Sequence, residues 1–248
     1  MTKVMSMFLA GVALLLSAPA FAIDGQVLIN QSTVMAAGGF PYKITQSGSY
    51  KLSGNLVVPA GTDGIDILAD NVTLDLNGFN IGSTYSCTYD NTSVPCTGST
   101  SGTGVYSVEH YNVSVTDGSI TGFGSAGVDL YGSGEIIEGV RASQNGEGIV
   151  LDGGLVRHCT GNLNRRDGID AAAAVVQDNE TDENGIWGID VVDATVTGNE
   201  ADGNVQYGLG AARSVYGGNL FWANRLGDVQ NEGGAISQSN NSCSATLC

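Results

Sequence analysis

Two aspartates, Asp170 and Asp190, end successive copies of the same local sequence, Gly-Ile-Asp. If the chain stacks with the period of these copies, the two carboxylates lie side by side at the spacing of neighbouring strands, about 5 Å. Like charges at that distance either raise one pKa or hold a cation between them. Carboxylate oxygens suit Ca²⁺, so the pair is a candidate metal site and a candidate for carboxylate catalysis. The alternative is a solvated acidic edge in which each Asp hydrogen-bonds the next turn.

A second group of candidates lies beside the same repeated glycines. Trp187 and Tyr207 have the same spacing as the two aspartates, and each directly precedes a glycine. A flat aromatic face can pack against the apolar C–H face of a sugar ring. Arg165 and Arg166 lie on the preceding turn, where a guanidinium could pair with the carboxylate of an acidic sugar. We take these four residues as candidate substrate-binding residues, the alternative being an aromatic ladder that only stabilises the turn.

The spacing of both groups belongs to a longer repeat. A glycine followed by an aliphatic residue recurs along the chain, at Gly64, Gly104, Gly127, Gly148, Gly168, Gly188 and Gly208. From Gly127 onward every step is about 20 residues, and a nearly fixed period of this size indicates a solenoid. The longer first step predicts an insertion over residues 82–103 that projects from a turn.

Asparagines form two further columns with the same period. The first contains Asn179, Asn199 and Asn219 and begins with Cys159, and the second contains Asn164, Asn184, Asn204 and Asn224. Stacked coils place such side chains above one another, where amides can hydrogen-bond as a ladder. Cys159 is therefore interpreted as a small buried side chain at the end of a ladder, rather than as a reactive thiol.

The segments between the turns have the composition of strands. Sequences such as GIDIL (64–68) and NVTLDL (71–76) alternate apolar and polar residues and are rich in Val, Ile and Thr. The chain contains 37 glycines, and helix-forming runs are nearly absent after Ala22. The leucine spacing of leucine-rich repeats, the calcium-binding nonapeptide and the hexapeptide period are all missing. The pattern therefore predicts a right-handed parallel β-helix with three short strands in each coil.

The stretch from Gly48 to Ile81 resembles the opening coils of bacterial right-handed parallel β-helix proteins of the pectin-lyase-like superfamily, and the resemblance continues over about residues 40–230. It implies an all-β, single-stranded solenoid of about seven or eight coils. We expect an N-terminal cap at 23–50, the β-helix at 51–230 and a C-terminal cap or tail at 231–248. Leu220, Phe221 and Trp222 are expected to help cover the C-terminal end.

The resemblance also implies a bias toward carbohydrate binding or cleavage. Lyases of this superfamily use a basic residue as the base, often with Ca²⁺, but no stretch of this chain matches such a catalytic signature. Two alternatives therefore stand. The protein is either a scaffold that binds polysaccharide or acts as a surface or structural module, or a small Ca²⁺-dependent polysaccharide lyase, epimerase or glycoside hydrolase.

The N-terminal segment indicates export. Residues 1–22 contain Lys3, a short apolar run and the sequence Ala20-Phe21-Ala22, which together are typical of a cleavable signal peptide. The apolar run is too short to span a bilayer comfortably, and no later segment is a candidate membrane span. We therefore expect a secreted or periplasmic protein.

Cysteines and charge complete the expectations. Cys87 and Cys96 bracket one polar loop and Cys243 and Cys248 another, which predicts two local disulfides in an oxidising compartment. The 25 acidic and 9 basic residues give a formal net charge of −16. Such a surface argues against nucleic acid as a partner, because phosphate binding needs basic residues.

Overall fold

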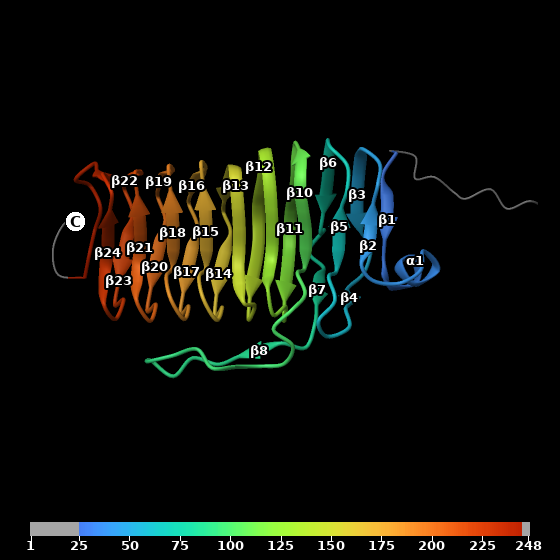
Figure 1. Ribbon diagram of the computed structural model, residues 1–248, viewed down its shortest axis with the longest axis horizontal. Helices are drawn as coiled ribbons and strands as arrows, with labels where there is room; N and C mark the ends of the chain where they lie inside the picture. The colour runs from blue at the N-terminus through green and yellow to red at the C-terminus, as the bar shows by residue number, and fades with distance from the viewer. Residues whose placement is uncertain (1–24, 245–248) are drawn as a thin grey trace, which may run out of the picture.

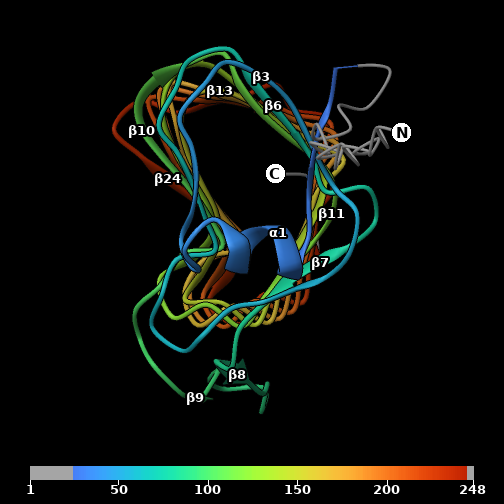
Figure 2. The ribbon, with the colours of Figure 1, turned by 90° about the vertical axis from the view of Figure 1, so that its right-hand side faces the viewer.

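The computed structural model describes residues 25–244 and shows a right-handed parallel β-helix. Strands stack into a rod, and the end-on view shows one closed coil outline repeated along it (Figure 1, Figure 2). The predicted fold class is confirmed. The stack has about ten turns, more than the seven or eight expected, because residues assigned to the two caps also form strands. The expected signal peptide, residues 1–22, lies outside the described residues.

Each regular coil contains three strands that pair in parallel with those of the next coil. The first position in the coil is held by β2 (Tyr42–Ile44), β5 (Ile65–Ile67), β10 (Val105–Tyr111), β12 (Ala126–Ser143), β13 (Glu147–Arg157), β15 (Ile169–Ala172), β18 (Ile189–Val192), β21 (Tyr207–Ala212) and β24 (Gly227–Glu232). The second is held by β1 (Val27–Ile29), β3 (Gly48–Leu52), β6 (Val72–Asp75), β11 (Val113–Thr121), β16 (Val175–Gln177), β19 (Thr195–Thr197), β22 (Val215–Gly217) and β25 (Ile236–Ser237). The third is held by β4 (Leu56–Val57), β7 (Asn80–Gly82), β14 (Thr160–Asn162), β17 (Glu180–Asp182), β20 (Glu200–Asp202) and β23 (Leu220–Trp222). The long strands β11, β12 and β13 continue around a corner, so each pairs at more than one position.

The core is a set of inward columns that run along the rod. The register pairs the aliphatic residues that follow the repeated glycines, and all are fully buried: Val105, Val128, Ile149, Ile169, Ile189 and Leu209. No coil could bury such a side chain by itself, so the stacking of neighbours supplies the core. At the N-terminal end the short helix α1 (Gln31–Ala36) lies across the coil and buries Val34 against the core (Figure 2).

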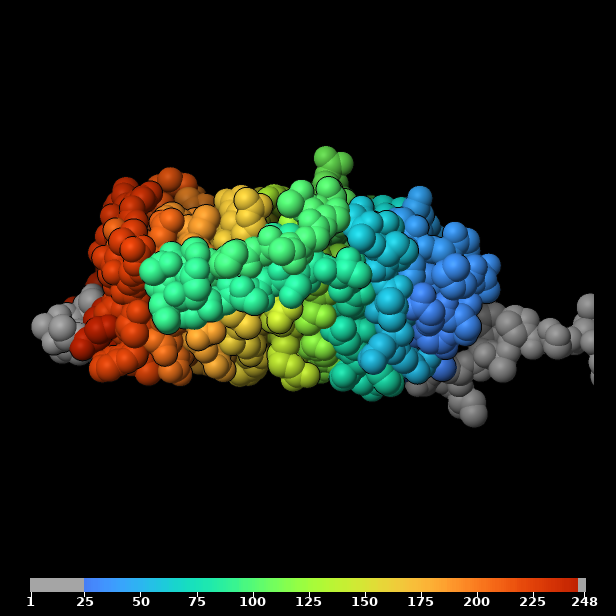
Figure 3. Space-filling model, turned by 90° about the horizontal axis from the view of Figure 1, so that it is seen from below, coloured from blue at the N-terminus to red at the C-terminus, as the bar shows by residue number. Residues whose placement is uncertain are grey.

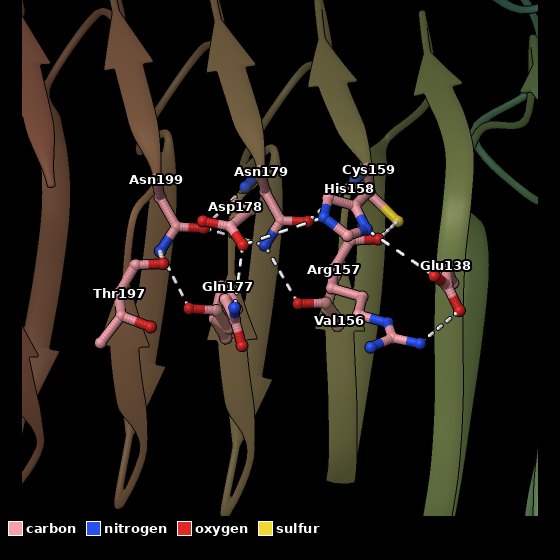
Figure 4. A network of polar contacts seen from close by, with 11 residues as sticks. Glu138, Val156, Arg157, His158, Cys159, Gln177, Asp178, Asn179, Thr197 and Asn199 are labelled. Atoms are coloured by element: carbon pink, nitrogen blue, oxygen red, sulfur yellow. Dashed lines mark hydrogen bonds and ion pairs between the residues drawn. The ribbon is translucent and has the colours of Figure 1, made fainter. Parts of the chain in front are cut away.

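The asparagine columns are hydrogen-bonded ladders, as predicted. In one of them Asn179 Nδ2 donates to Asn199 Oδ1 at 2.9 Å, and the Cys159 N–H donates to Asn179 Oδ1 at 2.9 Å (Figure 4). The Cys159 side chain is only 2% exposed, and burial raises the pKa of its thiol to about 12. A thiol with that pKa stays protonated at neutral pH, so Cys159 is a structural residue at the end of its ladder.

The insertion predicted after β7 is a hairpin of β8 (Ser86–Cys87) and β9 (Cys96–Thr97), closed by the predicted Cys87–Cys96 disulfide. It leaves the rod at the turn after β7 and stands outside the coil outline (Figure 2). The hairpin lies along the turns of the following coils (Figure 1, Figure 3). Val94 of the hairpin and Val205 of a later turn share a small buried apolar cluster with Tyr85 and Cys87. Apolar side chains on the insertion thus find their partners on the flank of the rod.

The C-terminal end differs from the expectation in one respect. Phe221 is fully buried, but Leu220 and Trp222 are exposed on either side of it. Strand side chains alternate between faces, so an inward Phe221 places both neighbours outward. The second predicted disulfide involves Cys248, which lies outside the described residues. Within residues 25–244, no helix has the length and apolar character needed to cross a bilayer.

Candidate functional site

The first strands present an outward column of polar residues. Register pairing joins Asp129 to Val150, Val150 to Asp170, and Asp170 to Asp190 on successive coils. The adjacency expected for Asp170 and Asp190 is therefore present. The column continues in both directions, through Lys43, Asp66 and Tyr106 on the N-terminal side and Gly210 and Gln230 on the C-terminal side.

A tighter acidic cluster forms where two coils enter their first strands. Glu147 begins β13, Asp167 stands just before β15, and Asp170 is the second residue of β15. One carboxylate oxygen from each of the three lies within 4.8 Å of the others. Oxygen ligands of a single Ca²⁺ lie at most about 5 Å apart, twice the usual metal–oxygen distance. The donor set therefore fits a hard divalent cation, and its members are Asp170, Glu147 and Asp167 rather than the expected pair of Asp170 and Asp190.

Sequence reasoning missed Glu147 and Asp167 as partners of Asp170. The two residues occupy equivalent positions of successive coils, directly before a repeated glycine. The period of the repeat shows which residue of the next coil stacks on each member of this column. How close the column lies to Asp170 depends on how the turn bends into β15, and the spacing of residues in the sequence does not predict that bend.

The carboxyls of this face have perturbed pKa values. Burial, followed by the charges of Glu147 and Asp170, raises the pKa of Asp129 to about 6. Burial raises the pKa of Asp167 to about 6, although its Oδ1 accepts a 2.9 Å hydrogen bond from the Trp187 backbone N–H. Burial and then the charge of Asp170 raise the pKa of Asp190 to about 7. The face thus takes up protons near neutral pH, or a cation in their place.

Arg166 and Arg165 differ in their surroundings. Arg166 Nη1 lies 3.0 Å from Glu147 Oε1, and its charge opposes the upward pKa shifts that burial causes in Glu147 and Asp170. Arg165 is exposed on the adjoining turn. Its carbonyl packs against Gly185, which also faces Val94 of the hairpin. The structure therefore brings Arg166 into the acidic cluster and leaves Arg165 at the border between the cluster and the hairpin.

The two aromatic candidates lean toward the coil that follows each of them. A Cβ on Gly210 would lie 2.9 Å from the Trp187 ring and 2.9 Å from Asp190 Oδ1, so the indole and this carboxylate share the surface above Gly210. Trp187 is partly buried, and its Nε1 has no hydrogen-bond acceptor among the described residues. The Tyr207 ring lies against Gly227 in the same way. Trp187 is thus beside the acidic column, and Tyr207 lies one coil further along.

A second polar region lies between the second and third strands. A shallow groove of about 390 Å³ is lined by His158, Cys159, Thr160, Asp178, Asn179, Glu180, Gly198 and Glu200. The exposed His158 ring stands between Glu138, at 3.7 Å, and Asp178, at 3.8 Å (Figure 4). Glu138 also pairs with Arg157 at 2.9 Å. Since no Trp, Tyr or Phe lines the groove, the acidic cluster beside Trp187 is the better candidate site.

Comparison with known proteins bears on the fold. No protein-family model matches the chain, and no curated protein matches it. The solved structure of the Dettilon tailspike protein (gp208) is similar, with a TM-score of 0.53 and 13% identity, over 85% of this chain and 57% of that one. The A-module of the Azotobacter vinelandii mannuronan C-5 epimerase AlgE6 gives a TM-score of 0.47 and 15% identity, over 85% of this chain and 74% of that one. This chain spans little more than half of the tailspike, and the likeness to the tailspike together with the coil geometry establishes that it has the right-handed parallel β-helix fold.

Proposed function

We propose that the protein is an exported β-helix scaffold that binds polysaccharide on the face formed by its first strands. The observation that carries this proposal is the convergence of Glu147, Asp167 and Asp170 beside the Arg166 guanidinium, with Trp187 and Asp190 on the adjoining surface. Carboxylates accept hydrogen bonds from sugar hydroxyls, and an indole packs against the C–H face of the ring.

The shape of the face supports an extended ligand. Asp129, Asp170 and Asp190 stand on stacked parallel strands, so equivalent positions on successive coils lie about 5 Å apart along the rod. Side chains on such strands hold their positions better than side chains on loops, which favours preorganised binding. A linear chain of sugars can follow the column from Asp129 toward Tyr207, whereas a compact ligand would use only one coil.

The charge of the face restricts its ligands. The face carries the carboxyls of Asp129, Glu147, Asp167, Asp170 and Asp190, and the Arg166 guanidinium pairs with Glu147. A neutral polysaccharide meets no electrostatic barrier on this face. An acidic polysaccharide would need Ca²⁺ held by Glu147, Asp167 and Asp170, where the cation would bridge protein and sugar carboxylates.

Export is supported by the disulfide. The Cys87–Cys96 bond fits an oxidising compartment such as the periplasm or the extracellular medium. The N-terminal sequence adds the pattern of a cleavable signal peptide. Both observations favour a location where the protein would meet polysaccharides.

A second candidate function is catalysis on polysaccharide by a Ca²⁺-dependent lyase, epimerase or glycoside hydrolase. The observation that favours it is Asp190, whose pKa of about 7 suits a group that gives and takes protons at neutral pH. Asp170 is its register partner and belongs to the candidate cation site. Chemistry at this position would therefore depend on both residues.

The experiment that tests both functions uses the secreted protein and a panel of neutral and uronate-rich polysaccharides, with Ca²⁺ or with chelator. Co-sedimentation measures binding, and ultraviolet absorbance of unsaturated ends together with reducing ends measures cleavage. We expect binding without product, reduced at least tenfold by Trp187→Ala. Trp222→Ala is the matched control, because Trp222 is 53% exposed on β23, away from the acidic face. Product that disappears in Asp190→Asn would establish the enzyme instead, and failure to bind any glycan would exclude the scaffold proposal.

A further inference from the structure

Glu135 is a buried carboxyl that the proposed binding face does not use. It lies in β12 at the corner where this strand passes from the first to the second position of its coil, and it is 1% exposed. Both of its carboxyl oxygens are buried, and no side chain among the described residues hydrogen-bonds to them. Such a group is costly to bury in its charged form without a compensating donor or cation.

Glycines lie on both sides of Glu135. Gly154, its register partner on β13, has no side chain, so its backbone packs directly against the Glu135 backbone. On the other side, Glu135 Oε1 and the His110 carbonyl oxygen both occupy the space where a Cβ of Gly132 would lie. Both oxygens are acceptors, and they lie beside the same glycine in a buried site. A proton on Glu135 turns its carboxyl into a donor that the His110 carbonyl can accept.

The charges around Glu135 also favour its neutral form. Burial raises the pKa of Glu135, and the negative charge of Asp152 on β13 raises it further, against the N–H groups of Glu135 and Ser133. From β10, the His110 ring turns to Asp70 Oδ1 at 3.3 Å. Glu109, the other charged residue of that strand segment, is exposed. Among the described residues, no cationic side chain forms an ion pair with Glu135.

At the corner that contains Glu135, the pairing of β12 is irregular with both of its neighbouring strands. The pairing of β10 with β12 slips between Val108 and His110, and the pairing of β12 with β13 slips between Tyr131 and Glu135. Glu109 has a positive φ of 62°. Interrupted ladders leave fewer backbone hydrogen bonds to hold a segment, so the corner is a place where the coil can open locally.

We propose that Glu135 is a proton latch, whose neutral carboxyl donates a hydrogen bond to the His110 carbonyl and keeps this corner closed, and whose ionisation opens it. The proposal that Glu135 closes the corner does not depend on the proposed function of the protein. The effect of the latch on ligands rests on the proposed function, because the corner begins at Tyr131, which is 44% exposed and stands two residues after Asp129 of the binding face. Opening would move this ring away from the face.

The sign of the pH dependence follows from the raised pKa. The closed corner holds its proton more tightly than the open one, so the contribution of the latch is fully present below the ordinary pKa of a glutamate. It is lost as the pH rises from there to the raised pKa. Within that window each pH unit lowers the protection of the corner about tenfold, because opening releases one proton.

The test is amide hydrogen exchange on the full chain between pH 5 and 9, corrected for intrinsic exchange. In the wild type we expect peptides from 105–112 and 126–137 to lose protection as the pH rises, relative to peptides from 175–202. Glu135→Gln keeps the size of the side chain and a donor for His110 but cannot ionise. It should keep the corner protected at every pH.

Asp152→Asn serves as a second variant that leaves Glu135 in place. Removing the negative charge lowers the pKa of Glu135, so the loss of protection should end at a lower pH and the corner should be better protected at pH 8 than in the wild type. The proposal is overturned if Glu135→Gln keeps the pH dependence of the wild-type corner. It is equally overturned if Asp152→Asn leaves the corner unchanged or less protected at pH 8.

Discussion

The Tyr89 hydroxyl donates a 2.7 Å hydrogen bond to the Gly203 carbonyl, which lies 114 residues later in the chain. This bond fixes the disulfide-closed hairpin to a turn several coils away. Together with the contact of Val94 and Val205, it makes the insertion a brace along the flank of the solenoid. In a fold where each coil otherwise touches only its neighbours, a brace of this kind couples distant coils.

Tyr89→Phe is therefore expected to loosen the hairpin without unfolding the rod. A neutral hydrogen bond contributes about 1 kcal/mol, so opening of the hairpin should increase about fivefold. Hydrogen exchange or limited proteolysis of residues 85–97 measures this. Tyr111→Phe, at an exposed tyrosine outside the hairpin, is the control. Equal protection in Tyr89→Phe and the wild type would mean that the apolar cluster holds the hairpin by itself.

The acidic face predicts a protein that is more stable at pH 5 than at pH 8. The folded-state pKa values of Asp129 and Asp167 are about 6 and that of Asp190 is about 7, above the ordinary value for Asp. A raised carboxyl pKa gives stability that is complete below the unfolded pKa and is lost as the pH rises through the folded one. Urea unfolding at both pH values measures the difference.

Asp190→Asn isolates one contribution to that pH dependence. The neutral amide removes a charge that is costly to bury and is repelled by Asp170, so at pH 8 the variant should be more stable than the wild type by about 1 kcal/mol after allowance for solvent screening. At pH 5 the two proteins should be nearly equal. Asp178→Asn, at an exposed aspartate of the other polar region, is the control. A variant less stable than the wild type at pH 8 would contradict the assignment.

Calcium should replace the protons of the acidic cluster. At pH 8, Ca²⁺ is expected to raise the free energy of unfolding, by about 2.7 kcal/mol when its concentration is a hundred times the dissociation constant. The effect should shrink at pH 5, because protonated carboxyls do not bind the cation. Asp167→Asn and Glu147→Gln should lose most of it, whereas Asp178→Asn should retain it. Thermal unfolding with Ca²⁺ and with chelator tests this, and an equal effect of Ca²⁺ in all variants would place the ion elsewhere.

The asparagine ladder should contribute strongly to stability. Asn184 Oδ1 accepts from the Asn164 backbone N–H at 3.0 Å, and its Nδ2 donates to the Gly161 carbonyl at 2.7 Å. Asn184→Ala leaves both buried groups without partners, which costs about 3 kcal/mol. Asn231→Ala, at an exposed asparagine, should cost less than about 0.5 kcal/mol. Urea unfolding measures both, and equal effects would show that the ladder adds little.

The position of Trp187 should depend on the absence of a side chain at residue 210. The protein contains two tryptophans, so the Trp222→Phe background makes Trp187 the only source of indole emission. Gly210→Leu in this background is expected to displace the ring into water, with a red shift of its emission and weaker sugar binding. Ala212→Leu, further along the same strand, is the control. Unchanged emission in Gly210→Leu would mean that Trp187 does not rest on Gly210.

The sequence by itself determined the fold and which residues stack on one another in successive coils. The fixed period of the Gly-Ile-Asp lines, together with the asparagine columns, defines which residues become register partners, since identical coils stack identically. The pairing of Asp170 with Asp190 and that of Cys159 with Asn179 follow directly. The loop closed by Cys87 and Cys96 was also predictable, because two cysteines so close in a polar segment of an exported chain can close only a small loop.

Only the tertiary structure decided which residues lie beside one another when they are not register partners. Glu147 and Asp167 join Asp170 because a turn bends into β15, and the hairpin lies along the rod because Val94 and Tyr89 find partners on distant turns. The Glu135 carboxyl lies beside the His110 carbonyl of the preceding coil because Gly132 has no side chain in that space. A repeat specifies what lies one coil above or below a residue, since that distance is fixed by strand pairing. It leaves open what lies beside the residue, which depends on turn conformation and on the packing of side chains far apart in the sequence.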